Sequence, residues 1–368
     1  MRVIVSGGGT GGHINPAIAI AKYIKEKDAD AEILYVGTER GLEKNLVPAQ
    51  NIDIEYIDVY GFRRKLSPMN IFVAVKAVMA VSDSKKLLKK FKPDIVIGTG
   101  GYVCGPLLYA AAKMKIPTLI HEQNVIPGVT VKMLADKVDI VATSFDTTKS
   151  YLKKHNKIVL TGNPVRADLL NVASYEAKFK LGLDDKPTVL FMGGSLGAKS
   201  INDALVDIVS REMAEEYNII ASTGERNYDA VMGAIKEKIE ELPENIKIEP
   251  YIYNTDVVFA ACDLIICRTG AVTVSELAAS GKPSIVVPSP NVAHNHQEYN
   301  ARYLSDRGAA VLIHDDELTG TKLNAEILTL VNDKERLAEM SKNAKTAAVY
   351  GATDKIYTAV KELLGKND

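Results

Sequence analysis

Arg2-Val-Ile-Val-Ser6 runs directly into Gly7-Gly-Gly-Thr-Gly-Gly12 at the start of the chain, and Val189-Leu-Phe-Met192 runs into Gly193-Gly-Ser-Leu-Gly197 near its middle. Each is a short apolar run followed by a glycine-rich turn and then by a helical pattern. A strand that feeds such a turn and a helix is typical of doubly wound α/β domains with parallel sheets. The repeat therefore predicts two such domains in one chain.

The rest of the chain alternates between short apolar runs and helix-patterned segments. The runs are mostly β-branched and unalternating, as expected of parallel strands covered on both faces. The predicted strands are Arg2–Ser6, Ala31–Val36, Asp94–Ile97, Thr118–Ile120, Ile140–Ala142 and Ile158–Leu160 in the first half, and Pro187–Met192, Tyr217–Ala221, Ile246–Ile248, Leu264–Cys267, Ser284–Val287 and Ala310–Ile313 in the second. Two such sheets facing each other would form a cleft at the carboxyl ends of their strands, where ligands bind.

The length of 368 residues suits two domains, each with its own core. We predict the joint at Thr161-Gly-Asn-Pro-Val-Arg166, because Gly and Pro interrupt regular structure and Asn-Pro favours a turn. The expected domains are residues 1–163 and residues 164–342. A helical tail over residues 343–368 has apolar residues at helical spacing, which suits packing back on the first domain.

The composition is that of an ordinary globular protein, with 46% hydrophobic and 25% charged residues, and excludes a disordered or fibrous chain. The net charge of −1 is unevenly spread. Residues 1–164 carry 23 Lys and Arg against 15 Asp and Glu, whereas residues 165–368 carry 22 against 31. The basic first half indicates an anionic contact, either a phosphate-bearing ligand or an acidic membrane surface.

The three cysteines, Cys104, Cys262 and Cys267, are too few for a disulfide framework, and we expect buried thiols in a reducing compartment. The chain opens on strand-like residues rather than on a secretion signal. Its longest apolar run, 71–81, is interrupted by Lys76 and is far shorter than the roughly 20 residues that span a bilayer. We therefore expect a cytosolic protein that does not cross a membrane.

The first glycine-rich loop formally matches the GxGxxG dinucleotide motif. A dinucleotide site also needs an acidic residue at the end of the second strand, but that strand ends in Val36-Gly-Thr38 with Glu39 only beyond it. What remains is that glycines let backbone N–H groups approach an anion at a helix N-terminus. His13 follows the loop, so it is either a functional group beside that anion or an ordinary surface or core histidine.

Polar loops also follow two other predicted strands of the first half. Gly98-Thr-Gly-Gly-Tyr-Val-Cys-Gly-Pro106 is a second glycine-rich turn, which is either a structural turn or a second wall of a diphosphate site. His121-Glu-Gln-Asn124 places four polar groups at another strand end, where loops carry function. These loops lie at one edge of the predicted sheet.

Three loops in the second half are candidates for a nucleotide site. Gly193-Gly-Ser195 offers backbone donors and a hydroxyl at a helix start. Within Cys267-Arg-Thr-Gly-Ala-Val-Thr-Val-Ser-Glu276, the final carboxylate is either a helix-favouring charge or an acceptor for a ribose diol. Asn295-His-Gln297 lies near the same edge, and the His-x-His pair there lacks the further ligands of a metal site.

Six motifs together closely resemble the MurG family of glycosyltransferases, over residues 2 to about 310. They are Gly8-Gly-Thr-Gly-Gly-His13, Gly100-Gly-Tyr-Val-x-Gly-Pro106, His121-Glu-Gln-Asn124, Gly162-Asn-Pro-Val-Arg166, Gly193-Gly-Ser-x-Gly-Ala198 and Arg268-x-Gly-Ala-x-Thr-Val-Ser-Glu276. This family moves N-acetylglucosamine (GlcNAc) from UDP-GlcNAc onto lipid I, undecaprenyl-diphospho-MurNAc-pentapeptide, giving lipid II for the peptidoglycan cell wall. The resemblance implies a GT-B fold of two Rossmann-like domains and an inverting reaction with no bound metal or other cofactor.

The resemblance also implies the donor-binding residues. They are Thr10, Gly11, Gly12, Asn124, Arg166, Ser195, Ile252, Ala271, Val272, Thr273, Val274, Ser275, Glu276 and Gln297. Leu196 stands where the family usually has an amide, so only the backbone donors of that turn carry over. Where some relatives have two glutamines, only Gln297 matches.

The transfer chemistry assigns roles to several of these groups. The acceptor's C4 hydroxyl must lose a proton as it attacks, while UDP leaves with growing negative charge, which a helix N-terminus and Ser195 can stabilise. We expect His13 to be the base, with Glu122 as the second candidate. We expect Glu276 on the ribose of UDP. The lipid diphosphate would be held by the first-half residues Gly9, Gly100, Gly101 and Tyr102.

The membrane prediction rests on Gly61-Phe-Arg-Arg-Lys-Leu66 and on residues 71–92, where apolar residues precede Lys85, Lys86, Lys89, Lys90 and Lys92. This helix either covers the core with a solvated basic end or binds an anionic leaflet, with about 1 kcal/mol per basic residue. Both hold if Ile71–Val81 is core and the basic end faces lipid. We expect a peripheral protein on the cytoplasmic face of the cell membrane, with other cell-wall proteins as partners and no nucleic acid.

Three other functions stay open at the level of sequence. One is a different GT-B sugar-nucleotide enzyme, such as a UDP-GlcNAc epimerase or a lipid-A-type disaccharide synthase. Another is a nicotinamide-linked oxidoreductase built on the first glycine loop. The third is a sugar-nucleotide-binding protein without catalysis.

Overall fold

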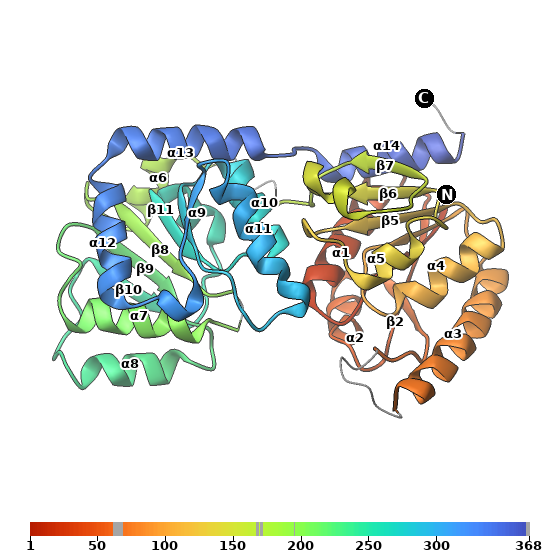
Figure 1. Cartoon of the computed structure of the whole chain (residues 1–368), viewed down its shortest axis with the longest axis horizontal. Helices are drawn as coiled ribbons and strands as arrows, with labels where there is room; N and C mark the ends of the chain where they lie inside the picture. The colour runs from red at the N-terminus through yellow and green to blue at the C-terminus, as the bar shows by residue number, and fades with distance from the viewer. Residues whose placement is uncertain (62–68, 167–168, 170–171, 195, 366–368) are drawn as a thin grey trace. The chain divides into compact units, whose positions relative to one another are not determined.

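The chain folds as two units, each built on its own parallel sheet (Figure 1). One unit comprises Met1–Pro164 and Val349–Asp368, and the other comprises Val165–Ala348. The structure is a computed structural model that describes residues 1–61, 69–166, 169, 172–194 and 196–365. Ser195 and the basic residues of the 61–66 loop, which the sequence singled out, lie outside these ranges.

The first unit has a seven-stranded sheet in the order β3-β2-β1-β4-β5-β6-β7. Its strands are β1 (Arg2–Ser6), β2 (Glu32–Gly37), β3 (Asp53–Tyr56), β4 (Ile95–Gly98), β5 (Thr118–Glu122), β6 (Ile140–Thr143) and β7 (Lys157–Leu160). The order reverses between β1 and β4, and ligands of doubly wound sheets bind at the carboxyl ends of the strands at such a reversal. The two predicted glycine loops follow these two strands.

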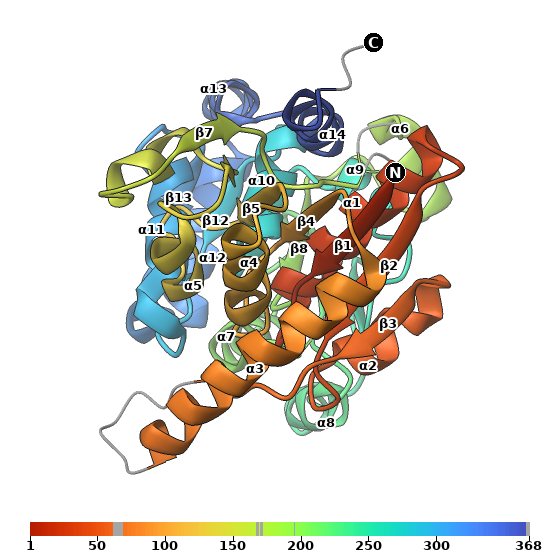
Figure 2. The ribbon, with the colours of Figure 1, turned by 90° about the vertical axis from the view of Figure 1, so that its right-hand side faces the viewer.

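Helices cover both faces of this sheet. Its helices are α1 (Gly11–Lys27), α2 (Glu43–Leu46), α3 (Met69–Phe91), α4 (Cys104–Lys113), α5 (Val129–Leu134) and α14 (Ala352–Leu363). Apolar residues of α1 and α14 pack on one face in a cluster with Val3 and Val5. Those of α3, α4 and α5 pack on the other face in a cluster with Ile4 and Val96, and Figure 2 shows α3 beside α4.

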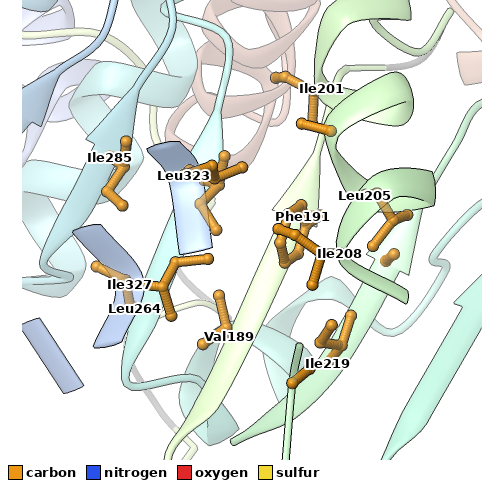
Figure 3. Packing of buried hydrophobic residues seen from close by; sticks show 14 of the residues in the cluster. Val189, Phe191, Ile201, Leu205, Ile208, Ile219, Leu264, Ile285, Leu323 and Ile327 are labelled. Carbon is orange, nitrogen blue, oxygen red and sulfur yellow. The ribbon is translucent and has the colours of Figure 1, made fainter. Parts of the chain in front are cut away.

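The second unit has a six-stranded sheet in the order β10-β9-β8-β11-β12-β13, with the same reversal between β8 and β11. Its strands are β8 (Thr188–Met192), β9 (Asn218–Ser222), β10 (Ile246–Glu249), β11 (Leu264–Cys267), β12 (Ser284–Val286) and β13 (Ala310–Leu312). Val189 and Phe191 of β8 pack against Leu205 and Ile208 in the core (Figure 3). The predicted pair of doubly wound domains is confirmed.

Eight α-helices are described in the second unit. They are α6 (Ser174–Lys180), α7 (Lys199–Ser210), α8 (Tyr228–Lys236), α9 (Thr255–Ala261), α10 (Ala271–Ser280), α11 (His296–Ser305), α12 (Gly320–Val331) and α13 (Lys334–Ala347). Leucine and isoleucine side chains of α7 and α12 cover one face of the sheet, as Figure 3 shows. Helices α7 and α10 follow β8 and β11, so both begin at the strand reversal.

The C-terminal tail differs from its predicted bounds. Residues 343–347 complete α13 in the second unit, and the chain joins the first unit only from Val349. Helix α14 then packs on α1, where the hydroxyl of Tyr23 donates to Asp354 at 2.7 Å. The apolar spacing in the sequence did not reveal that two helices share this stretch. Only a short break at residues 348–351 separates α13 from α14.

One strand and part of one helix differ from the sequence prediction. Strand β3 was not predicted, because it is a sheet edge whose Asp-Ile-Glu-Tyr sequence alternates instead of forming an apolar run. In α3, the run 71–81 was expected to be core. Val73 and Ala80 are buried, but Val75, Val78 and Met79 are exposed, and Val78 is 73% exposed.

Two other sequence features have a structural counterpart. All three cysteines are buried and free, as predicted, and burial raises the pKa of the Cys104 thiol to about 11. Across the described ranges, every helix is too short or too polar to cross a bilayer.

Candidate active site

The two glycine loops of the first unit pack directly on each other. Gly100 has a φ of +106°, and a Cβ there would lie 2.8 Å from Nδ1 of His13. Gly101 has a φ of +81°, and a Cβ there would lie 2.4 Å from the carbonyl oxygen of Gly8. Only glycine permits this backbone conformation and this close approach. The second loop therefore forms a wall against His13 and the first loop.

His13 lies in the first turn of α1 and is held by its Nδ1 atom. This nitrogen is 3.0 Å from the carbonyl oxygen of Thr99 and 3.0 Å from Oε1 of Gln123. A carbonyl oxygen cannot donate, so Nδ1 must carry the hydrogen. In the neutral imidazole, Nε2 then keeps the lone pair that accepts a proton. Among the described residues, we find no hydrogen-bond partner for Nε2.

Glu122, the second candidate base, is buried at the end of β5. Its Oε1 accepts from the backbone N–H of Asn124 at 2.9 Å, and its Oε2 accepts from that of Gly128 at 2.7 Å. Burial raises the pKa of the Glu122 carboxyl, while these hydrogen bonds act in the opposite direction. The carboxylate thus fastens the loop that carries Asn124, and this geometry favours a structural role over proton transfer.

Gly9 was predicted to bind a diphosphate, but its backbone N–H already has an acceptor. It donates to Oε2 of Glu43 at 3.2 Å. Glu43 is buried and also accepts from the backbone N–H and the hydroxyl of Thr38. This carboxylate, which sequence reasoning missed, ties the end of β2 to the glycine loop. Tyr102 reaches the same loop, with Cε1 3.6 Å from where a Cβ of Gly9 would lie.

The second unit contains a pocket of about 640 Å³ at the β8/β11 reversal. The first residues of α7 line it together with Gly193 and Gly194, and Gly270 and Thr273 line it at the start of α10. A helix N-terminus presents unpaired N–H groups and a partial positive charge. Two such termini beside one pocket suit a phosphate-bearing ligand.

An arginine that sequence reasoning did not assign lines this pocket. Arg268 Nη1 lies 2.5 Å from Oδ1 of Asp315, and Nη2 donates to the hydroxyl of Ser200 at 3.0 Å. Ser200 in turn donates to Asp315 at 2.5 Å. Arg268 directly follows strand β11 within one of the motifs above, so its position could have indicated a site residue. No sequence signal pointed to Asp315, because only the tertiary fold brings it to Arg268.

The predicted donor residues of the second unit fall into two groups. Thr273 and Gln297 line the pocket, and Oε1 of Gln297 is fixed by the backbone N–H of Ser289 at 2.8 Å. Glu276 is paired with Arg166 instead, with Nε 3.3 Å from Oε1. Glu276 is the sixth residue of α10, so it is not a first-turn charge that favours the helix.

The remaining predicted positions differ in what their side chains can reach. Val274 and Ile252 are buried, so their side chains are part of the protein core. Leu196, at the departure from the family pattern, lines the pocket and is 73% exposed. Thr10, Gly11, Gly12 and Asn124 belong to the first unit, where Gly11 and Gly12 begin α1. The contacts of these residues with UDP-GlcNAc stay predictions, as do those of Ala271, Val272 and Ser275.

The class of protein follows from the two sheets and from sequence comparison. Residues 3–143 match the N-terminal domain of glycosyltransferase family 28, and residues 188–356 match the C-terminal domain of the same family. The chain therefore belongs to glycosyltransferase family 28.

The particular relatives confirm the resemblance to the MurG family. A UDP-N-acetylglucosamine--N-acetylmuramyl-(pentapeptide) pyrophosphoryl-undecaprenol N-acetylglucosamine transferase of Acetivibrio thermocellus is 50% identical over 368 residues, covering 99% of this chain and 98% of the relative. The protein of the same name from Ruminiclostridium cellulolyticum is 48% identical, covering 99% of this chain and all of the relative (100%). The crystal structure of Acinetobacter baumannii MurG matches with a TM-score of 0.80 at 32% identity, covering 98% of this chain and 99% of that one.

Proposed function

We propose that this glycosyltransferase moves GlcNAc from UDP-GlcNAc to the C4 hydroxyl of MurNAc in lipid I, giving lipid II. The observation that carries the proposal is the pocket at the β8/β11 reversal, lined by the starts of α7 and α10. Its size and its helix termini suit a nucleoside diphosphate sugar. Relatives of matching length carry this activity in their names.

The second unit is the donor side of the proposed reaction. The helix termini and Arg268 face the diphosphate, which gains negative charge as the sugar departs. Glu276 accepts hydrogen bonds from the ribose diol, and Arg166 holds its carboxylate in place beforehand. Because the pair is formed within the second unit, the ribose site is preorganised before the donor arrives.

The first unit is the acceptor side. Gly11 and Gly12 begin α1, and the N–H groups of a helix's first turn have no partner within the helix. Gly9, Gly100, Gly101 and Tyr102 form the proposed diphosphate site beside this helix start, whose own Gly11 and Gly12 are predicted contacts to UDP-GlcNAc. Gly9 shapes the turn of the loop but offers no free N–H to the diphosphate, because its N–H donates to Glu43.

His13 is the proposed base. Its Nδ1–H is committed to Thr99 and Gln123, so Nε2 is the basic atom. The C4 hydroxyl loses its proton to Nε2 as its oxygen attacks the anomeric carbon, and the bond to UDP breaks with inversion. Glu122 is the weaker candidate, because backbone N–H groups already occupy both of its oxygens.

Helix α3 is the proposed contact with an anionic cytoplasmic membrane surface. The exposed Val75, Val78 and Met79 continue at helical spacing into the exposed Lys85, Lys86 and Lys89, so apolar and basic residues share one stripe. This arrangement suits an interface between lipid chains and anionic headgroups. A peripheral location, from which the protein reaches a polyprenyl-linked acceptor, follows from this stripe.

Calorimetric titration tests the donor assignment. We expect UDP-GlcNAc and UDP to bind to the intact protein, and NADH not to bind. Binding of NADH without binding of UDP would contradict the proposal and would favour an oxidoreductase built on the first glycine loop.

A further inference from the structure

Gln123 joins two histidines of the first unit through its side-chain amide. Its Oε1 lies 3.0 Å from Nδ1 of His13, and its Nε2 lies 2.9 Å from Nδ1 of His121. His121 Nε2 lies 2.9 Å from the carbonyl oxygen of Gly162, so that nitrogen must carry the hydrogen. The buried line therefore runs from Gly162 through His121 and Gln123 to His13.

The direction of every hydrogen bond in this line is determined. His121 donates from Nε2, so its Nδ1 is an acceptor in the neutral ring. Burial lowers the pKa of His121 to about 4, which keeps the ring neutral near pH 7. The Gln123 amide nitrogen must then face His121, where it also donates to the backbone oxygen of His121 at 3.2 Å. The amide oxygen is left to accept from His13.

We propose that Gln123 is a positioning residue that, oriented by His121, holds the His13 ring with Nδ1 protonated and Nε2 available as the base. This inference rests on the proposed role of His13. Thr99 also accepts from Nδ1 and Gly100 packs against the ring, but one backbone acceptor directs the N–H less closely than two acceptors do. The second acceptor fixes the plane of the ring. Preorganisation of this kind raises kcat without changing substrate affinity.

Two titratable groups among the described residues of the first unit act on His13. His121 and Glu122 of β5 interact with it electrostatically, and the packed loop at Thr99 and Gly100 contributes only backbone and a hydroxyl. A neutral substitution at Gln123 that keeps these residues therefore tests the amide and not a neighbouring charge.

Two substitutions separate the effect of the amide's hydrogen bonds from the effect of the side chain's size. Gln123→Met keeps the length and removes both polar atoms, whereas Gln123→Glu keeps an oxygen beside His13 in either charge state. Gln50→Met is the matched control, because Gln50 is exposed in the same unit and its side-chain oxygen accepts from the exposed Lys22. Thermal unfolding checks that each variant folds.

The first readout is the 15N-labelled imidazole of His13 in the free protein. We expect a slowly exchanging Nδ1–H and an unprotonated Nε2 in the parent chain. In Gln123→Met, the Nδ1–H resonance should move upfield and exchange with water faster, and in Gln123→Glu it should be retained. An unchanged resonance in a folded Gln123→Met variant would overturn the proposal.

The second readout is steady-state kinetics with UDP-GlcNAc and a soluble lipid I analogue. Gln123→Met should lower kcat about three- to tenfold, the effect of one hydrogen bond, with both KM values within about twofold. Gln123→Glu should recover most of the lost kcat. If the resonance moves but kcat does not, the positioning of His13 stands and its role as the base fails.

Discussion

At the scale of single residues, the proposed base is His13, whose Nε2 atom has no hydrogen-bond partner in the part of the chain that the structure describes. Thr99 and Gln123 fix the hydrogen of His13 on Nδ1, while Gly100 packs against the ring. Glu122 lies nearby with both oxygens satisfied by backbone donors. The structure thus separates two candidate bases that the sequence could only rank.

Replacing His13 with alanine should lower turnover by about 10²–10⁴-fold, the usual contribution of a general base. Affinity for UDP-GlcNAc should stay near that of the parent chain, because the pocket proposed for UDP lies in the second unit and His13 is not among the predicted contacts to UDP-GlcNAc. Steady-state kinetics and calorimetry measure the two effects separately. His155→Ala is the control, because this histidine is exposed and distant in sequence from both loops.

Two other outcomes would change the role of His13. A loss confined to the acceptor KM would make the imidazole a ligand of the diphosphate. A variant within about threefold of the parent in every parameter would make it structural, and Glu122→Gln would then be the next variant to measure.

His121 should make the stability of the first unit depend on pH. Its pKa of about 4 in the folded chain lies below its ordinary value of 6.5, so unfolding takes up a proton as the pH falls below 6.5. The stabilisation is complete above pH 6.5 and is lost toward pH 4, with a loss of about 2 kcal/mol by pH 5. Urea unfolding at pH 7 and pH 5 measures it.

The matched variant is His121→Gln, which cannot titrate. The parent chain should lose about 2 kcal/mol more than this variant between the two pH values. Equal losses would show that His121 titrates in the folded chain much as it does in water.

At the scale of elements, α10 carries the proposed ribose contact. Glu276 is nearly buried, with 11% of its side chain exposed, and is paired with the more exposed Arg166. Glu276→Gln should weaken UDP-GlcNAc binding by about 10- to 100-fold, because a charge-assisted hydrogen bond contributes about 1.5–3 kcal/mol. Calorimetry gives the dissociation constant, with exposed Glu335→Gln as the control. An unchanged constant would remove Glu276 from the donor site.

Helix α3 has a separate, testable role at the membrane. Reversing the charge of Lys85, Lys86, Lys89 and Lys90 should lower binding to anionic vesicles and leave turnover of a soluble acceptor near that of the parent chain. Binding of the parent should also weaken with salt, because screening acts over about 8–10 Å at physiological ionic strength. Reversal at the exposed Lys153 and Lys154 is the control. Vesicle binding that responds to neither change would mean that the basic residues are simply solvated.

The elements most visible in the sequence are the buried parallel strands. A central strand such as β8 is apolar on both faces, so its composition alone marks it. Edge strand β3 has alternating burial and gave no such signal. The exposure of Val75, Val78 and Met79 in α3 was also missed, because hydrophobicity predicts what prefers burial and not which residues the fold covers.

The candidate site was predictable where it follows strand ends. The glycine loops and His13 come directly after β1 and β4, and residues 121–124 span the end of β5 and the two residues after it, so topology alone gathers them. His121 and Gln123 are two residues apart, a spacing that places extended side chains on one side and could have suggested their contact. Glu43 and Asp315 lie outside such motifs, and only packing brings them to the loops that they support.

At the scale of the whole molecule, the same strand order occurs twice. Each unit has its reversal between its first and fourth strands, and each reversal carries glycine-rich loops and a helix start. The proposed assignment of the sugar donor to the second unit and of the acceptor to the first follows from the groups around each reversal. The second unit has a pocket of about 640 Å³ lined by an arginine, whereas the first has a histidine whose Nε2 atom has no hydrogen-bond partner among the described residues. Transfer between two substrates needs one site of each kind.

Transfer itself is the most direct test of this account. The protein is incubated with UDP-GlcNAc labelled in the sugar and a soluble polyprenyl-diphospho-MurNAc-pentapeptide analogue. We expect labelled GlcNAc to appear on the C4 oxygen in β-linkage, because one displacement inverts the α-linkage of the donor, with one UDP released per transfer. Binding of the donor without transfer, or epimerised sugar released without acceptor, would contradict the account.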